Sequence, residues 1–316
     1  MKKRVVIGID TSNYTTSYAV LTEGGELIAN LKRPLPVKAG ERGLRQSDAV
    51  FAHVKNLPEL ANEAKIYLAD CEIVAVGVSE RPRNIEGSYM PCFLAGVSVA
   101  EHLATALGIP IYRFSHQCGH VMAAVYSSGR SELLDCTFAA YHVSGGTTEL
   151  IRVRAADCGF STELVGGTAD LNAGQIIDRI GVHMGLPFPS GKFIEELALE
   201  NTQRIPSRKP TVRGMTANLS GLENLAVKLY ADSGDKCLVA AFVLDYIGRA
   251  IELTCDAFTE EYGNTPFIFA GGVMCNSIIK RRLEKRFDAA FAEPAMSADN
   301  AVGVAELARR AHFVNK

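Results

Sequence analysis

One strand pattern occurs twice in this sequence, and it constrains the fold more than any other feature. Three short apolar runs typical of strands occur early in the chain, at Arg4–Ile9, Thr16–Leu21 and Leu27–Leu31. Three similar runs occur in the middle of the chain, at Phe138–Val143, Thr148–Val153 and Phe160–Leu164. In each copy a short polar turn joins the first two runs. We therefore predict one module that is present twice in the chain.

Each module is followed by a segment in which helical and strand patterns alternate. In the first half, helices are expected at Ala49–Ala69, at Phe93–Leu107 and from His116, with strands at Ile73–Val78 and Pro110–Phe114. In the second half, helices are expected at Ala173–Met184, Lys192–Glu200, Leu222–Ala231, Lys236–Tyr262, Asn276–Arg286 and Ala298–His312, with strands at Phe267–Ala270 and Ala289–Phe291. The pattern predicts an α/β fold with two lobes and a nucleotide cleft between them, residues 1–132 completed by 292–316 and residues 133–291.

Composition narrows the class of protein. The chain has 316 residues, of which 47% are hydrophobic and 22% charged, so a folded protein of two ordinary domains is expected. No uncharged run of 18 apolar residues occurs, and the basic start at Met1–Arg4 leads directly into a strand pattern. We predict a cytoplasmic protein with no membrane segment. The formal net charge of -2 gives no sign that nucleic-acid binding dominates the surface.

Two histidines form a candidate metal site. His116 and His120 follow Ser115, a residue type that caps helices, and their spacing places both on one helix face. Two imidazoles so placed can share one ion. The alternative is that one or both are ordinary core or surface histidines, which is the more frequent case for a bare pair.

Glycine pairs after strands are candidate phosphate contacts. The turn Ser144-Gly145-Gly146-Thr147 follows the first strand of the second module, and the Asp10–Asn13 turn holds the same place in the first. A further pair, Gly271-Gly272, ends a strand and leads through Val273 to Asn276 into a helix. Backbone N–H groups at such turns and helix starts can bind the phosphates of a nucleotide. Each pair alone could also be only a tight turn.

Seven short motifs occur in the order found in one protein family. They are Gly8–Ser12, the His116/His120 pair, Val143–Thr147, Asp178 within Gly174–Arg179, Gly185–Gly191, Ala270–Asn276 and Ser297–Ala301. On these motifs the chain resembles the tRNA N6-adenosine threonylcarbamoyltransferase family, formerly described as O-sialoglycoprotein endopeptidases. The resemblance runs over nearly the whole chain. It implies the duplicated actin-like ATPase fold of actin, sugar kinases and Hsp70.

The resemblance also implies a set of functional residues. The metal ligands would be His116, His120 and Asp299, holding one divalent ion, iron or zinc. ATP or an acyl-adenylate, with Mg²⁺ as a further candidate, would contact Val143, Ser144, Gly145, Gly146, Thr147, Asp178, Gly191, Gly271, Gly272 and Asn276. The same resemblance places Asp10 and Tyr14 at catalytic positions. Without it, Asp178 and Asn276 could be a surface charge and a helix cap, and Asp299 a carboxylate at a helix start capped by Ser297.

Two departures from the family pattern bear on activity. Tyr14 occupies a position where the family has an acidic residue, and Cys118 stands where it has Glu between the histidines. We therefore expect a divergent paralogue. The leading hypothesis is transfer of threonylcarbamoyl from its adenylate to tRNA, with accessory proteins of the modifying complex as further partners. The alternatives are carbamoyl transfer to another acceptor and a nucleotide-binding scaffold without catalysis, while a protease is disfavoured because no nucleophile is paired with a base. Oligomeric state is not determined by the sequence.

Overall fold

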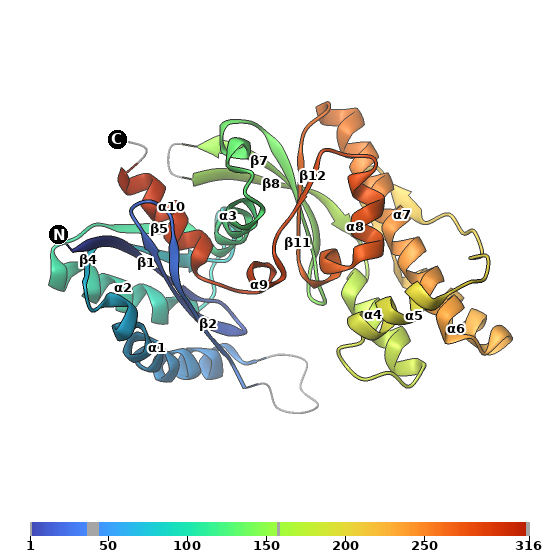
Figure 1. Cartoon of the computed structure of the whole chain (residues 1–316), viewed down its shortest axis with the longest axis horizontal. Helices are drawn as coiled ribbons and strands as arrows, with labels where there is room; N and C mark the ends of the chain where they lie inside the picture. Colours follow the sequence, from blue (N-terminus) through green and yellow to red (C-terminus); the bar gives the residue numbers. More distant parts are fainter. Residues whose placement is uncertain (1, 37–43, 157–158, 314–316) are drawn as a thin grey trace. The chain divides into compact units, whose positions relative to one another are not determined.

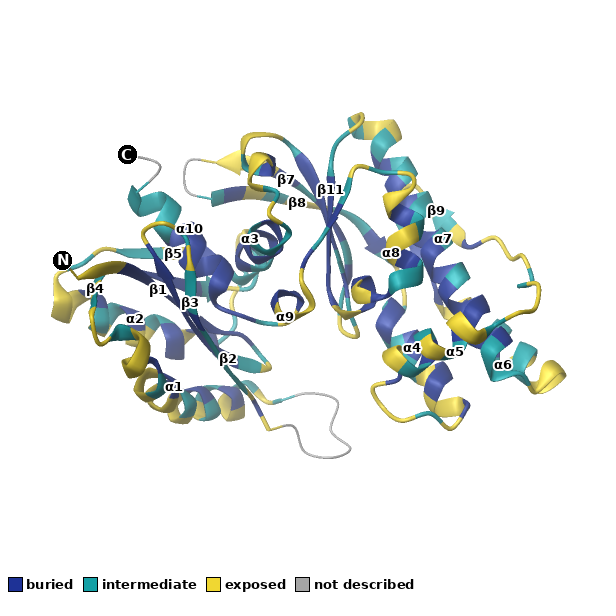
Figure 2. Cartoon of the chain, in the orientation of Figure 1, coloured by how far each residue is buried: buried dark blue, intermediate teal, exposed yellow. Residues whose placement is uncertain are grey.

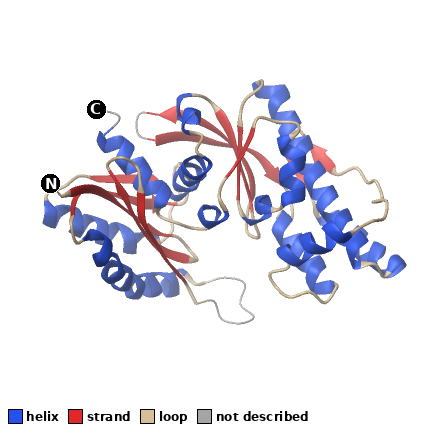
Figure 3. Cartoon of the chain, viewed as in Figure 1, coloured by secondary structure: helices blue, strands red, loops and turns tan. Residues whose placement is uncertain are grey.

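The computed structural model describes residues 2–36, 44–156 and 159–313. The chain divides into two compact units. The first comprises Met1–Ser131, Ala155–Thr162 and Ala295–Lys316, and the second comprises Glu132–Arg154 and Glu163–Pro294. Both units combine strands with helices (Figure 3). In the described part of the chain, no helix is both long and apolar enough to cross a membrane.

The first unit is organised around a five-stranded sheet in the order β3-β2-β1-β4-β5 (Figure 1). Its strands are β1 (Lys3–Thr11), β2 (Thr15–Thr22), β3 (Leu27–Pro34), β4 (Cys71–Arg81) and β5 (Ile111–Ser115). Its helices are α1 (Gln46–Leu68), α2 (Phe93–Leu107), α3 (His116–Ser128), α9 (Pro294–Ser297) and α10 (Val302–Phe313). Figure 2 shows that β1 and β2 are buried along most of their length, because helices cover both faces of this sheet.

Glycines allow α10 to lie directly on the sheet. Gly8 of β1 and Gly77 of β4 are neighbours across the two parallel strands. A Cβ atom at Gly8 would lie 2.4 Å from the Ala301 carbonyl oxygen, and one at Gly77 would lie 2.4 Å from that of Val304. A Cβ atom at Gly303 would likewise lie too close to the backbone of α3, at 1.8 Å from the Gly119 carbonyl oxygen. This close packing brings the segment before α10 to the carboxyl end of β1.

The second unit contains a seven-stranded sheet in the order β12-β11-β6-β7-β8-β10-β9. Its strands are β6 (Phe138–Val143), β7 (Thr148–Ala156), β8 (Gly159–Thr168), β9 (Thr211–Arg213), β10 (Thr216–Asn218), β11 (Phe267–Ala270) and β12 (Ala289–Phe291). Its helical elements are η1 (Ser131–Asp135), α4 (Ala173–His183), α5 (Gly191–Glu200), α6 (Ser220–Ser233), α7 (Lys236–Tyr262), η2 (Gly272–Cys275) and α8 (Ser277–Glu284). The short β9–β10 hairpin was not expected from the sequence.

The two sheets share one topology. In the first, β1 pairs antiparallel with β2 and parallel with β4, and in the second, β6 pairs antiparallel with β7 and parallel with β11. The order β3-β2-β1-β4-β5 therefore recurs as β8-β7-β6-β11-β12. The predicted duplication is confirmed, since both copies place the first strand of the module at the same position in the sheet.

The last helix begins later than the sequence suggested. A helix over Ala298–His312 with Ser297 as its cap is wrong, because α10 starts at Val302. Asn300 terminates the preceding loop: its Oδ1 accepts from the Val302 N–H at 3.0 Å, and its amide donates to two carbonyls upstream. Asp299 consequently lies in the loop between α9 and α10 and not in the first turn of a helix.

Candidate functional site

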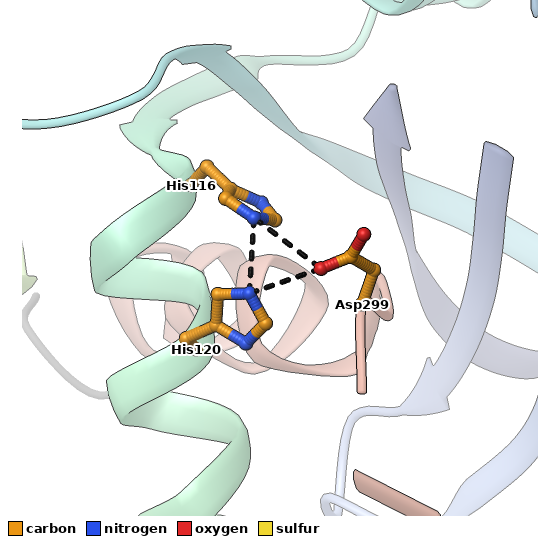
Figure 4. A group of neighbouring side chains, drawn as sticks. All are labelled: His116, His120 and Asp299. Carbon is orange, nitrogen blue, oxygen red and sulfur yellow. Dashed lines mark hydrogen bonds and ion pairs between the residues drawn. The ribbon is translucent and has the colours of Figure 1, made fainter. Parts of the chain in front are cut away.

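Three side chains with metal-ligand chemistry converge in the first unit. His116 and His120 project from the first turns of α3 toward the Asp299 carboxylate (Figure 4). The Nε2 atoms of the two histidines are 2.9 Å apart, and Asp299 Oδ1 lies 3.6 Å from His116 Nε2 and 3.2 Å from His120 Nε2. Ser115 caps α3 by accepting from the Cys118 N–H at 3.2 Å, so the predicted cap is confirmed.

The donor set fits one divalent ion. Ligand atoms that each lie roughly 2.1 Å from a common zinc or iron are at most about 4.2 Å apart. All three distances in this group are shorter than that limit. Two imidazoles and one carboxylate leave coordination positions open, which is the arrangement of catalytic and not of closed structural sites.

Asp10 lies behind the histidines and orients one of them. The His116 Nδ1 atom is 2.7 Å from Asp10 Oδ2, so an Nδ1–H bond to this carboxylate leaves Nε2 to face the other ligands. Asp10 is itself held in place, because it accepts from the Ser12 N–H and from the Ser79 hydroxyl. Ser12 also donates from its hydroxyl to Asp299 Oδ2 at 3.1 Å.

Charges in this cluster shift the pKa values of its members. Burial alone would lower the pKa of His116, but the Asp10 carboxylate, with Asp299, raises it to about 10. Burial would raise the pKa of Asp299, yet hydrogen bonds from His116 and His120 hold it well below its usual range. The pKa of Asp10 is also lowered, because His116 outweighs the effect of burial. His116 thus carries a proton that any ion at Nε2 has to displace.

Tyr14 and Cys118 are the two departures from the family pattern. The Tyr14 side chain is 49% exposed and makes no hydrogen bond with a described residue, although its carbonyl accepts from the Leu35 N–H. Cys118 is buried on another face of α3, where the Asn84 amide donates to its sulfur at 3.2 Å. Neither side chain supplies the carboxylate that the family has at that position.

The second unit contains a pocket of about 360 Å³. Five of the residues expected to contact nucleotide line it, namely Gly145, Asp178, Gly191, Gly272 and Asn276. A Cβ atom added at Gly145, Gly191 or Gly272 would meet no protein atom within 4 Å, so each faces open space. Asp178 accepts from the Ser190 N–H through Oδ1, which fixes the carboxylate at the pocket wall.

The other expected nucleotide contacts shape the loops around the pocket. Ser144 Oγ accepts from the N–H groups of Gly146 and Thr147, so it closes the turn after β6. Gly271 has a φ of 100° and packs against the Val143 backbone, where a Cβ atom would lie 2.2 Å from the carbonyl oxygen. Asn276 also caps α8 by accepting from two N–H groups, as the alternative interpretation of this residue predicted.

Two candidate functional residues, Ser79 and Glu195, were not predicted from the sequence. Ser79 could have been inferred from the topology, because β4 runs parallel to β1 and the carboxyl ends of neighbouring parallel strands meet. Glu195 lines the pocket one turn after Gly191 on α5, and its Oε1 accepts from the Ser277 N–H at 2.7 Å. Helical spacing from Gly191 was the available signal for Glu195.

Solved structures of similar fold cover almost the whole chain. The (R)-2-hydroxyglutaryl-CoA dehydratase component A of Acidaminococcus fermentans matches with a TM-score of 0.54 and 16% identity, over 97% of this chain and 98% of that chain. A ROK family glucokinase from Streptomyces griseus, in complex with glucose and AMPPNP, matches with a TM-score of 0.53 and 14% identity, over 97% and 99%. Together with the duplicated sheet topology, these likenesses define a two-lobed α/β protein of the actin-like ATPase fold, as predicted.

Sequence comparison identifies the family. The family model for tRNA N6-adenosine threonylcarbamoyltransferase (TsaD) matches residues 40–306, and the chain belongs to this family. The tRNA N6-adenosine threonylcarbamoyltransferase of Streptococcus suis (strain 05ZYH33) is 30% identical over 294 residues, which cover 90% of this chain and 84% of that protein. The protein of the same name from Bacillus subtilis (strain 168) is 29% identical over 299 residues, covering 90% and 82%.

Proposed function

We propose that the chain is a metal-dependent acyltransferase that moves a threonylcarbamoyl group from its adenylate to N6 of adenosine in tRNA. The observation that carries this proposal is the His116–His120–Asp299 group with the Asp10 carboxylate behind it, in a member of this family. These three residues would hold one ion, iron or zinc. Such an ion acts as a Lewis acid on a carbonyl or phosphoryl oxygen when it is bound.

The chain's own residues would orient the reactants. Asp10 keeps the Nδ1–H tautomer of His116, and Ser12 fixes the Asp299 carboxylate. In the reaction, N6 would form a bond to the carbamoyl carbon, the bond from that carbon to the adenylate phosphate would break, AMP would leave and N6 would lose a proton. We assign the adenylate, or ATP with Mg²⁺, to the pocket at Gly145 and Gly272, with Asp178 available to a ribose hydroxyl.

We further propose that the two compact units are the two lobes of the enzyme, and that tRNA and the accessory proteins of a modifying complex are its partners. These reactants point to a cytoplasmic place of action. The formal net charge of -2 means that tRNA affinity would need local basic surface or a partner that supplies it.

A second candidate is carbamoyl transfer to an acceptor other than tRNA, and a third is a nucleotide-binding scaffold without catalysis. Tyr14 favours both, because its half-exposed side chain replaces an acidic residue of the family pattern. The His116–His120–Asp299 group favours catalysis over the scaffold, because a scaffold needs no open coordination positions.

The deciding experiment incubates the protein with tRNA, threonine, bicarbonate, ATP and an enzyme that makes the adenylate, and then measures modified adenosine. Wild type is expected to form product, and His116→Ala is expected to lose metal and product together. Tyr14→Asp should increase the yield if the missing acid limits the reaction. Absence of product with wild type and Tyr14→Asp, where a standard family member works, would reject tRNA as the acceptor.

A further inference from the structure

A row of polar side chains crosses the first sheet beside the candidate metal site formed by His116, His120 and Asp299. Asp10 of β1 stands opposite Ser17 of β2, and Ser17 stands opposite Lys32 of β3. Directly opposed residues of antiparallel strands point to the same face of a sheet. This face is the one covered by α10, because Gly8, two residues before Asp10, contacts Ala301. Lys32 therefore lies on the face to which Asp299 belongs.

Lys32 brings an unpaired positive charge to this place. Its Nζ donates to the Ala295 carbonyl at 2.8 Å, four residues before Asp299 in the chain. Among the described residues no carboxylate forms an ion pair with Lys32, whereas its neighbour Arg33 pairs with Glu63. Burial lowers the pKa of Lys32, while the negative charge of the Asp299 carboxylate acts to raise it. The two groups therefore interact electrostatically. A half-buried ammonium with one carbonyl partner has donors to spare.

Two buried oxygen atoms near Lys32 also have no hydrogen-bond partner among the residues that the structure describes. One is Ser17 Oγ, directly opposite Lys32, and the other is Asn30 Oδ1, on the same face of β3 two residues earlier. Buried polar atoms are nearly always satisfied, by protein or by bound polar groups and water. These atoms and the free N–H donors of Lys32 mark a place built for a polar ligand and its water.

We propose that Lys32 is an anion contact of this site, and that its ammonium holds a carboxylate or phosphate oxygen of a ligand beside His116, His120 and Asp299. The inference rests on the proposed function, and it names a substrate-positioning residue that the family pattern did not point to. Lys32 then selects ligands that carry a negative charge at the end that faces the site. The alternative is that Lys32 only ties the Ala295 segment in place.

The test uses the full-length protein loaded with Co²⁺, whose visible absorption changes when an anion enters an open position. One arm titrates acetate, as a carboxylate probe, and the other titrates inorganic phosphate. Lys32→Gln should weaken at least one anion about tenfold, the effect of one hydrogen bond to a charged group. Lys32→Arg should stay within about threefold of wild type, because it keeps the charge. Arg33→Gln removes a charge from the opposite face of the same strand and should change nothing.

The outcomes separate the sources of the anion and the role of the lysine. A selective loss of acetate binding assigns Lys32 to a carboxylate, and a selective loss of phosphate binding assigns it to a phosphate; either supports the inference. Glutamine can still donate to the Ala295 carbonyl, so a loss of Co²⁺ affinity in Lys32→Gln would reveal only a structural tie and overturn the inference. If both anions bind Lys32→Gln as they bind wild type, the role of Lys32 is overturned and the proposed metal site is not. If wild type takes up no Co²⁺, the proposed metal site is overturned as well.

Discussion

Replacing Asp10 by asparagine should weaken metal binding without changing the volume of the side chain. Both carboxylate oxygens of Asp10 accept hydrogen bonds, Oδ1 from the Ser12 N–H and Oδ2 from the Ser79 hydroxyl and His116. Asparagine offers one oxygen and one NH₂ group. If its oxygen faces His116, the NH₂ group meets the Ser12 N–H, and two donors oppose each other in a buried place. If its NH₂ group faces His116, the ring turns to the tautomer with hydrogen on Nε2, which cannot bind an ion.

Either arrangement removes the charged partner of a histidine in the candidate metal site. Such partners typically contribute 10- to 100-fold to metal affinity, or about 1.4–2.8 kcal/mol. We expect a loss in this range for Asp10→Asn, measured by competition between the protein and a chelator for Zn²⁺ near neutral pH. Asp178→Asn, the same change in the other unit, should leave Zn²⁺ affinity unaltered. An Asp10→Asn protein that is folded and binds Zn²⁺ within about threefold of wild type would refute the role of Asp10 in orienting His116.

Three further predictions follow from the same contacts. Gly145→Val should abolish the stabilisation by adenine nucleotide in thermal-shift measurements, because the valine side chain would fill space that the phosphate needs. That stabilisation is about 2.7 kcal/mol at a hundredfold excess of nucleotide over the dissociation constant. The nucleotide-free variant should melt like wild type, because a Cβ atom at Gly145 meets no protein atom within 4 Å. In the metal-free protein, the stability difference between wild type and Asp10→Asn should be full between about pH 4 and pH 6.5, where Asp10 is ionised and His116 protonated in both states. The difference should shrink as the pH rises toward the raised His116 pKa of about 10, because the imidazolium that Asp10 stabilises is then lost. Denaturation at several pH values would contradict this if the difference grew with pH. Gly303→Ala should lower the free energy of unfolding by about 1–3 kcal/mol or more, because the new Cβ atom would lie 1.8 Å from the Gly119 carbonyl oxygen. An unchanged midpoint of urea unfolding would argue against the tight contact between α3 and α10.

Local sequence determined the repeated module and the histidine pair. Strand alternation and turn residues act over a few positions, so the three-strand pattern was visible in both halves, and the topology confirmed the duplication. The Ser115 cap and the four-residue spacing of His116 and His120 are likewise properties of one helix. The same local reasoning placed Asp299 in a helix, where Asn300 was the competing cap that local patterns did not resolve.

The family resemblance named His116, His120 and Asp299 as one ligand set, but only the tertiary structure shows how these residues meet and that Asp10 and Ser79 lie behind them. Asp10, His116 and Asp299 are far apart in the sequence. They come together because β1 and β5, which leads into α3, both pair parallel with β4, and because glycines let α10 lie against β1 and β4. The place of Lys32 depends on strand register, since a shift of one residue would turn it to the opposite face. Register and close helix packing arise from contacts between distant segments, which no pattern within a single segment contains.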